Sequence, residues 1–308
     1  MSESVGIALR FALYLDLMLL FGLGLFGLYG LKASERPSGD VLNFKGWLAG
    51  TALLGMLLSM ASLLVMTRAM SGEQEWLALG PHLQMMLGQT EFGLTWILRI
   101  GVLLVAALVA LNCAQWPSIS LWLATWAAGV ALATLAWAGH GAMDDGALRA
   151  WHLIADSAHL LAAGAWVGAL VAFGLLLMPG SVQDIQRVKI LARALTGFEW
   201  IGVALVTALI LTGVGNYLFV VGPSLDGVAS SAYGILLSLK LALFGVMLGM
   251  AALNRFHLSP FMQRAVEAGQ YTLACRALRR SLSVEFGAVL LILGLVAWLG
   301  TLGPMASD

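Results

Sequence analysis

The segment at residues 151–168 holds the side chains that are best suited to chemistry. His152, Asp156 and His159 stand in an otherwise apolar stretch, four and then three residues apart. On an α-helix, at about 100° per residue, the three side chains fall within roughly 60° of one another. Imidazole and carboxylate groups are costly to place inside a bilayer and usually serve ions, protons or substrate there. The pattern therefore predicts an intramembrane polar site.

The elements that must position this site are membrane helices. Of the 308 residues, 60% are hydrophobic and 10% are charged, and the mean hydropathy is +0.92. This is more apolar side chain than a soluble domain can bury. The formal net charge is zero, which argues against nucleic acid as a partner. Cys113 and Cys275 lack CxxC spacing, so the sequence indicates neither a disulfide framework nor a thiolate cluster.

Eight apolar segments are long enough to cross a hydrocarbon core of about 30 Å. They are residues 5–31, 46–69, 92–112, 118–138, 148–178, 190–221, 231–254 and 281–302. The segment Glu75–Gly88 is too short to cross and is expected to form an interfacial helix between spans two and three. We therefore predict an all-α, polytopic membrane bundle of eight transmembrane helices, with residues 1–308 as a single domain.

Basic residues predict the sidedness. The connections after spans one, five and seven carry Lys32, Arg36, Lys45, Arg187, Lys189, Arg193, Arg255, Arg264, Arg276, Arg279 and Arg280. The opposite connections carry little beyond Arg68 and Arg149. By the positive-inside rule, both termini are expected on the periplasmic side. The basic loop from Arg255 to Arg280 is then cytoplasmic, and we expect it to hold a short amphipathic helix.

This topology brings further metal-binding side chains toward the outer face. His140 ends span four on that side, and a short connection separates it from His152. Secondary candidates in the outer connections are His82, Met85, Met86 and Met143. Imidazole suits copper among other metals and thioether selects Cu(I), so the combination favours copper, as Cu(I) or Cu(II). The simpler alternatives are a helix-to-helix hydrogen bond for His140 and packing for the methionines.

Other intramembrane polar residues are expected to share this interior. They are Arg10, Asp16, Arg99, Asn216 and Lys240 in the outer half, with Glu285 towards the cytoplasmic end of the last span. Such residues line ion pathways or pair with one another. Pairing of Asp16 with Arg99 or Lys240 is the alternative that requires no transport.

Several motifs along the chain match a known family. They are Ala8-Leu9-Arg10-Phe11, Gln89-Thr90-Glu91-Phe92-Gly93, Gly139-His140, the stretch from His152 to Gly168, Gly215-Asn216, Leu239-Lys240, Asn254-Arg255 and Glu285. In these residues the chain resembles the copper resistance protein D (CopD) family of bacterial inner-membrane proteins. The resemblance covers nearly the whole chain.

The resemblance implies a copper-handling protein of the inner membrane, surrounded by lipid, that is not an enzyme and moves copper inward. It also implies a separate periplasmic copper carrier, CopC, as a partner. His140, His152 and His159 stand at the family's histidine positions and are the implied ligands. Asp156 is then expected to orient an imidazole rather than to bind the metal itself.

Two other functions remain open from the sequence. The first is a haem-binding redox protein that exchanges electrons with quinone. His152 and His159 lie only about 10 Å apart on one helix, which is too close for two haems. Ligation of one haem by two histidines needs an imidazole from a second helix, which His140 could supply. The second function is that of a metal sensor or an assembly partner for another membrane complex.

Overall fold

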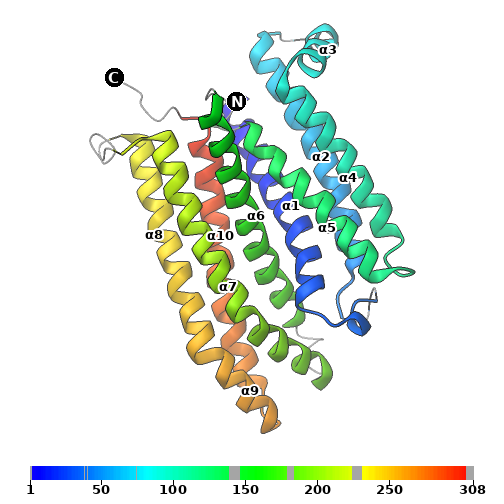
Figure 1. Ribbon diagram of the computed structural model, residues 1–308, viewed down its shortest axis with the longest axis vertical. Coiled ribbons are helices and arrows are strands. Elements are labelled where there is room, and N and C mark those ends of the chain that lie inside the picture. Colours follow the sequence, from blue (N-terminus) through cyan, green and yellow to red (C-terminus); the bar gives the residue numbers. More distant parts are fainter. Residues whose placement is uncertain are drawn as a thin grey trace.

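The computed structural model describes residues 2–37, 39, 41–73, 75–138, 146–178, 184–223 and 231–302. Within these ranges it contains helices and no strands, and eight of the helices are long and apolar enough to cross a membrane. The predicted fold class is therefore confirmed. The helix α1 begins and α10 ends at the same end of the molecule (Figure 1), as an even number of spans requires.

The first half of the chain forms four spans and one short helix. The spans are α1 (Ser2–Tyr29), α2 (Phe44–Ser71), α4 (Glu91–Leu111) and α5 (Pro117–Ala133), the last of which continues as the 3-10 helix η3 (Thr134–Ala138). The short helix α3 (Gly80–Gln89) follows the 3-10 turn η2 (Trp76–Leu79) and packs against α2 and α4. The short helix predicted between spans two and three is therefore present.

The second half forms the other four spans. They are α6 (Gly146–Leu176), α7 (Ile185–Val220), α8 (Ala232–Leu253) and α10 (Thr272–Leu299). A π-helical turn, η7 (Asn254–Leu258), leads from α8 into the short helix α9 (Ser259–Glu267). In Figure 1 the helices α2 to α5 lie on one side and α7, α8 and α10 on the other, with α1 and α6 between them. The two halves meet along α1, which packs against both α6 and α10.

Polar caps begin several of the spans. The side chains of Asn43, Thr90, Asp184 and Ser231 accept hydrogen bonds from the first-turn backbone N–H groups of α2, α4, α7 and α8. These bonds satisfy donors that the helix itself leaves unpaired. The helix α2 ends at Gly72, whose φ of +69° is the left-handed conformation that glycine adopts without strain.

Glycines create the close contact between α1 and α6. A Cβ atom on Gly22 of α1 would collide with the Gly164 carbonyl oxygen and the Gly168 backbone of α6. The same is true of a Cβ on Gly168, which would meet Gly22. Because the backbones themselves touch, this seam fixes α6, and the polar stripe on it, against α1.

The last span and the loop before it differ from the prediction. Helix α10 begins at Thr272 rather than near residue 281, so Arg276, Arg279 and Arg280 belong to the helix and not to a loop. Hydropathy marks only the apolar part of a helix, and here the helix extends beyond it in a basic turn whose Arg279 donates to the Leu177 carbonyl. The expected amphipathic helix is α9, which buries Met262 and exposes Arg264.

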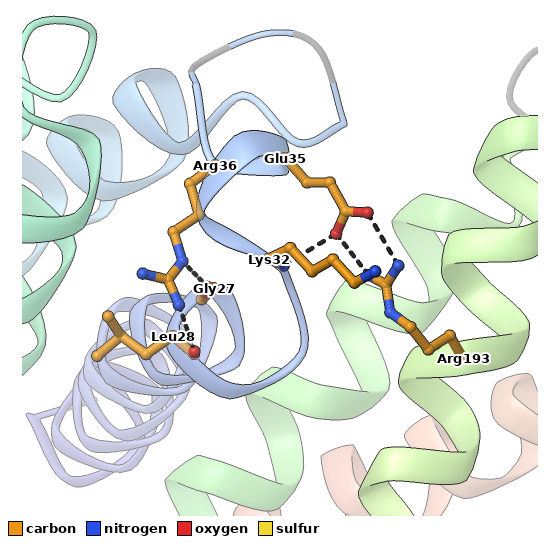
Figure 2. Close-up of polar contacts among 6 residues, drawn as sticks. All are labelled: Gly27, Leu28, Lys32, Glu35, Arg36 and Arg193. Carbon is orange, nitrogen blue, oxygen red and sulfur yellow. Dashed lines mark hydrogen bonds and ion pairs between the residues drawn. The ribbon is translucent and has the colours of Figure 1, made fainter.

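Polar contacts hold the segment that follows α1 in place (Figure 2). This segment lies at the end of the bundle opposite to the start of α1. Arg36 donates to the last-turn carbonyls of Gly27 and Leu28, at 3.0 Å and 2.6 Å. Glu35, in the 3-10 turn η1 (Ala33–Glu35), accepts two hydrogen bonds from Arg193 of α7, one of them 2.9 Å long. These contacts join the first span to the second half of the chain.

Candidate functional site

The polar stripe on α6 faces a cavity of about 630 Å³. Side chains from α1, α2, α4, α6, α7, α8 and α10 line it, and we call it the His152 cavity. Its polar and charged lining residues are Arg10, Tyr14, Ser62, Arg99, His152, Asp156, His159, Asn216, Tyr217, Tyr233, Lys240 and Thr301. Seven of the residues that the sequence predicted to form the stripe or to share its polar interior therefore meet here, namely Arg10, Arg99, His152, Asp156, His159, Asn216 and Lys240.

His152 is the most enclosed member of the stripe, with 2% of its surface exposed. Its ring stacks on Phe219 of α7, with centroids 5.0 Å apart and planes inclined by 24°. Its Nε2 atom lies 3.8 Å from the Asp156 Oδ2 atom, one helical turn along. The carboxylate thus stands beside the imidazole, which suits an orienting role.

Asp156 is itself held by the neighbouring helix α7. The Asn216 side-chain amide donates to Asp156 Oδ1 at 2.6 Å. A carboxylate that is fixed by an amide and placed next to an imidazole is the arrangement that commonly sets the orientation of a metal-binding histidine.

The protonation of the His159 ring follows from its partner. Nδ1 of His159 lies 2.9 Å from the hydroxyl oxygen of Thr212 in α7. That hydroxyl donates its single hydrogen to the Ala208 carbonyl oxygen, at 2.6 Å. With its hydrogen placed there, the Thr212 oxygen accepts from Nδ1 of His159, and we infer that the neutral ring carries its hydrogen on Nδ1. This leaves the Nε2 lone pair of His159 available to a ligand such as a metal ion.

Three cationic side chains enter the same cavity. Arg99 of α4 is 3% exposed and donates to the hydroxyl and the carbonyl oxygen of Thr134, at 2.7 Å and 3.3 Å. Arg10 comes from α1 and Lys240 from α8. Among the residues that the structure describes, no ion pair joins Asp16 to Arg99 or Lys240, so the alternative of mutual pairing is not realised.

Two residues of the predicted polar interior lie elsewhere. Asp16 is buried in α1 but faces α2, where its Oδ2 atom lies so close to Gly55 that a Cβ there would come within 2.7 Å. Glu285 of α10 is also buried, and it accepts a hydrogen bond from Asn254 of the π-helical turn. Neither side chain lines the His152 cavity.

The secondary ligand candidates are not gathered around the stripe. His82, Met85 and Met86 lie on α3, and none of them lines the His152 cavity. Met86 is buried between α2 and α4, where its sulfur accepts a hydrogen bond from Thr67 at 3.2 Å, while Met85 is exposed. His140 and Met143 lie outside the described residues.

A second cavity lies among the helices that the second half of the chain forms. It has a volume of about 270 Å³ and is lined mainly by apolar side chains of α6, α7, α8 and α10. Its polar groups include Glu199, which accepts from Ser259 at 2.9 Å, and Glu285 with its partner Asn254. We call it the Glu285 cavity.

Sequence reasoning missed the partners that the stripe finds on other helices. Thr212 and Phe219 hold the two imidazoles, and Tyr14 faces the cavity from α1. Tyr14 stands one helical turn after Arg10, a spacing that could have placed it on the same face. Among the described residues, no three His, Cys, Asp or Glu side chains form a group able to hold a metal ion.

Comparisons with known proteins identify the family. The model of the "Copper resistance protein D-like, N-terminal domain" matches residues 1–151, and that of "Copper resistance protein D" matches residues 192–299. Copper resistance protein D of Pseudomonas syringae pv. tomato is 53% identical over 304 residues, which are 99% of this chain and 98% of that protein.

A second relative is more distant. Inner membrane protein YebZ of Escherichia coli (strain K12) is 30% identical over 264 residues, which are 84% of this chain and 86% of that protein. No solved structure matches the chain. With its eight apolar helices, the chain is a multi-pass inner-membrane protein with a role in copper handling, and it belongs to the copper resistance protein D family.

Proposed function

We propose that this chain binds copper at His152 and His159 and passes it inward from the periplasm. The observation that carries the proposal is the His159 ring. Its Nδ1 atom is hydrogen-bonded to Thr212, while its Nε2 lone pair remains available to a metal ion. His152 lines the same cavity beside Asp156, and Asn216 holds that carboxylate in place. Two imidazoles of one helix, each fixed by a neighbour, suit the coordination of copper.

The direction rests on the distribution of charge. Arg36 and Arg193 lie at the end of the bundle where α1 ends (Figure 2). The His152 cavity is lined by residues within 6–14, in the first half of α1. Basic residues mark cytoplasmic ends, so the His152 cavity faces the periplasm. A periplasmic carrier of the CopC kind could then deliver copper to it, and His140 could provide a third imidazole.

The test is copper binding by purified His152→Ala and His159→Ala variants. We expect each variant to lose more affinity than the roughly 10- to 100-fold that loss of a ligand's supporting hydrogen bond costs. His257→Ala is the matched control, because His257 is exposed on the π-helical turn at the opposite end of α8. If the double variant bound one copper per chain with unchanged affinity, the site would have to be abandoned.

Transport itself needs sealed vesicles. Uptake of copper into vesicles of right-side-out orientation should depend on His152 and His159, whereas inside-out vesicles should not accumulate it. Accumulation only in inside-out vesicles would reverse the proposed direction. No accumulation in either orientation, together with intact copper binding, would leave a sensor or assembly function.

The haem alternative makes a different prediction. Among the described residues, His152 and His159 of α6 are the only histidines that line the cavity, so an opposing imidazole from a second helix would have to be His140. A visible absorption spectrum of the purified protein with a Soret band would favour haem over copper.

A further inference from the structure

The His152 cavity carries more positive than negative charge. Arg10, Arg99 and Lys240 line it, against the single carboxylate of Asp156. Arginine stays protonated under all ordinary conditions, so two of these charges are permanent. A cavity that received only a bare copper cation would repel it electrostatically. The excess positive charge of the lining therefore favours the binding of an anion, since the described residues that line the cavity supply only one negative charge.

Arg99 is the clearest case. It is almost completely buried, yet its two hydrogen-bond partners among the described residues are neutral oxygen atoms of Thr134. No described carboxylate lies within 4.0 Å of it, and its Nη1 atom has no hydrogen-bond partner among the described residues. Buried charges are normally paired, because an unpaired charge in a low-dielectric interior is expensive.

The other two cations line the same cavity as His152 and His159. Lys240 lies close enough to His159 and to Asp156 to interact with them electrostatically. Arg10 and Arg99 both lie near the Tyr14 hydroxyl, which lines the same cavity. Neither Arg10 nor Lys240 has a described carboxylate within ion-pair distance.

The size of the cavity agrees with a ligand larger than an ion. Its volume of about 630 Å³ is many times the share of about 30 Å³ that one water molecule occupies in the liquid. A metal ion, a small anion and several waters fit within it together.

We propose that the His152 cavity binds copper together with a small carboxylate anion, which Arg99, Arg10 and Lys240 hold while His152 and His159 face the metal. The inference rests on the proposed copper binding at these two histidines. A carboxylate can bind both to the cationic side chains and to the metal. Guanidinium groups bind it through paired hydrogen bonds, and its oxygens are accepted ligands of Cu(II). Asp156 is already held by Asn216 and supplies only one such charge.

The test uses Cu(II) and acetate with the purified full-length protein. Copper is titrated at increasing acetate, with nitrate keeping the ionic strength constant. Coupled ligands typically change each other's affinity by about 5- to 150-fold, so we expect acetate to tighten copper binding by at least about 5-fold. Acetate also complexes copper in solution, which can only weaken the apparent binding, so a gain in affinity has to come from the protein.

Variants separate the anion from the metal. Arg99→Gln should abolish the acetate dependence and should tighten copper binding in the absence of acetate, because a repelling charge is removed. Lys240→Gln is a second variant with the same expectation, should Arg99→Gln fail to fold. Arg264→Gln is the control, since Arg264 is exposed on α9 and should leave the acetate dependence intact.

Three outcomes would overturn the proposal. Copper affinity that acetate leaves unchanged or weakens would show that no anion is bound with the metal. An equal effect of chloride would replace the carboxylate by a general anion. With ¹³C-labelled acetate, pulsed EPR of the bound Cu(II) should detect the labelled carbon, and its absence would exclude a shared site. A wild-type protein that binds no copper in any buffer would instead refute the proposed function.

Discussion

The hydrogen bond between Thr212 and His159 offers the sharpest test of the copper site. Thr212→Val replaces the hydroxyl by a methyl group of similar size, so packing in α7 is nearly preserved. His159 then loses the acceptor that lies 2.9 Å from its Nδ1 atom. The ring no longer has a reason to keep its hydrogen on Nδ1 and its Nε2 lone pair toward the cavity.

The expected magnitude follows from this role. Removing the hydrogen-bond partner of a metal-binding histidine typically costs 10- to 100-fold in metal affinity, which is about 1.4–2.7 kcal/mol. The cost in folding stability should be smaller, about 1 kcal/mol, because one buried hydrogen bond is lost. Copper titration and thermal unfolding of the purified protein measure the two quantities separately.

Two further variants make the result interpretable. Thr212→Ser keeps the hydroxyl and should retain most of the affinity. Thr95→Val is the matched control, because within the described part of the chain the Thr95 hydroxyl donates to the Phe92 carbonyl of its own helix, and Thr95 lines neither cavity. If Thr212→Val bound copper as tightly as the wild type, His159 would not be a ligand through Nε2, and the Thr212 hydroxyl would not set the tautomer of the ring.

The other predictions concern the scaffold. Gly22→Ala forces a Cβ against the Gly168 backbone, so we expect a loss of about 1–3 kcal/mol in stability, seen as a lower thermal midpoint. Gly50→Ala, whose Cβ meets open space, should not lower the midpoint. If both variants lowered the midpoint equally, the close packing of α1 on α6 would not explain the effect of Gly22→Ala. The hydrogen bond from Arg193 holds the pKa of Glu35 below its usual value of 4.5. The contribution of this ion pair to folding stability is therefore present above about pH 4.5 and is lost as the pH falls further. It is at most about 1 kcal/mol, because the pair is partly exposed. Between pH 7 and pH 3 the thermal midpoint of the wild type should fall more than that of Glu35→Gln. If the two midpoints fell by the same amount, the ion pair would contribute nothing to stability.

Most of the fold was predictable because a bilayer admits few backbone arrangements. Apolar length alone located the eight spans and separated them from α3, which is too short to cross. The prediction was least accurate at the start of α10, where arginines interrupt the apolar pattern although the helix continues. A hydropathy pattern shows where lipid surrounds a helix, and it does not show where the backbone hydrogen bonds end.

The site was predictable as a face of one helix and not as a set of neighbours. Helical spacing placed His152, Asp156 and His159 together, but it carries no information on which helix packs against them. Spacing did not exclude Asp16 from the predicted interior, because Asp16 points in nearly the same direction as Leu9, which lines the cavity. Asp16 lies about 10 Å further along α1 than Leu9, and there it faces α2.

The two cavities bear on how copper could move under the proposed function. On α7 the His152 cavity is lined by residues 213–220 and the Glu285 cavity by residues 195–207, and on α8 by residues 233–240 and 248–252. The turns in between bury Leu209 of α7 and Met247 of α8. Under the proposed function, copper that moves from the His152 cavity to the Glu285 cavity has to pass the level of these two apolar side chains, which offer it no charged group. The helices that carry them are packed on different neighbours, α7 mainly on α6 and α8 mainly on α10.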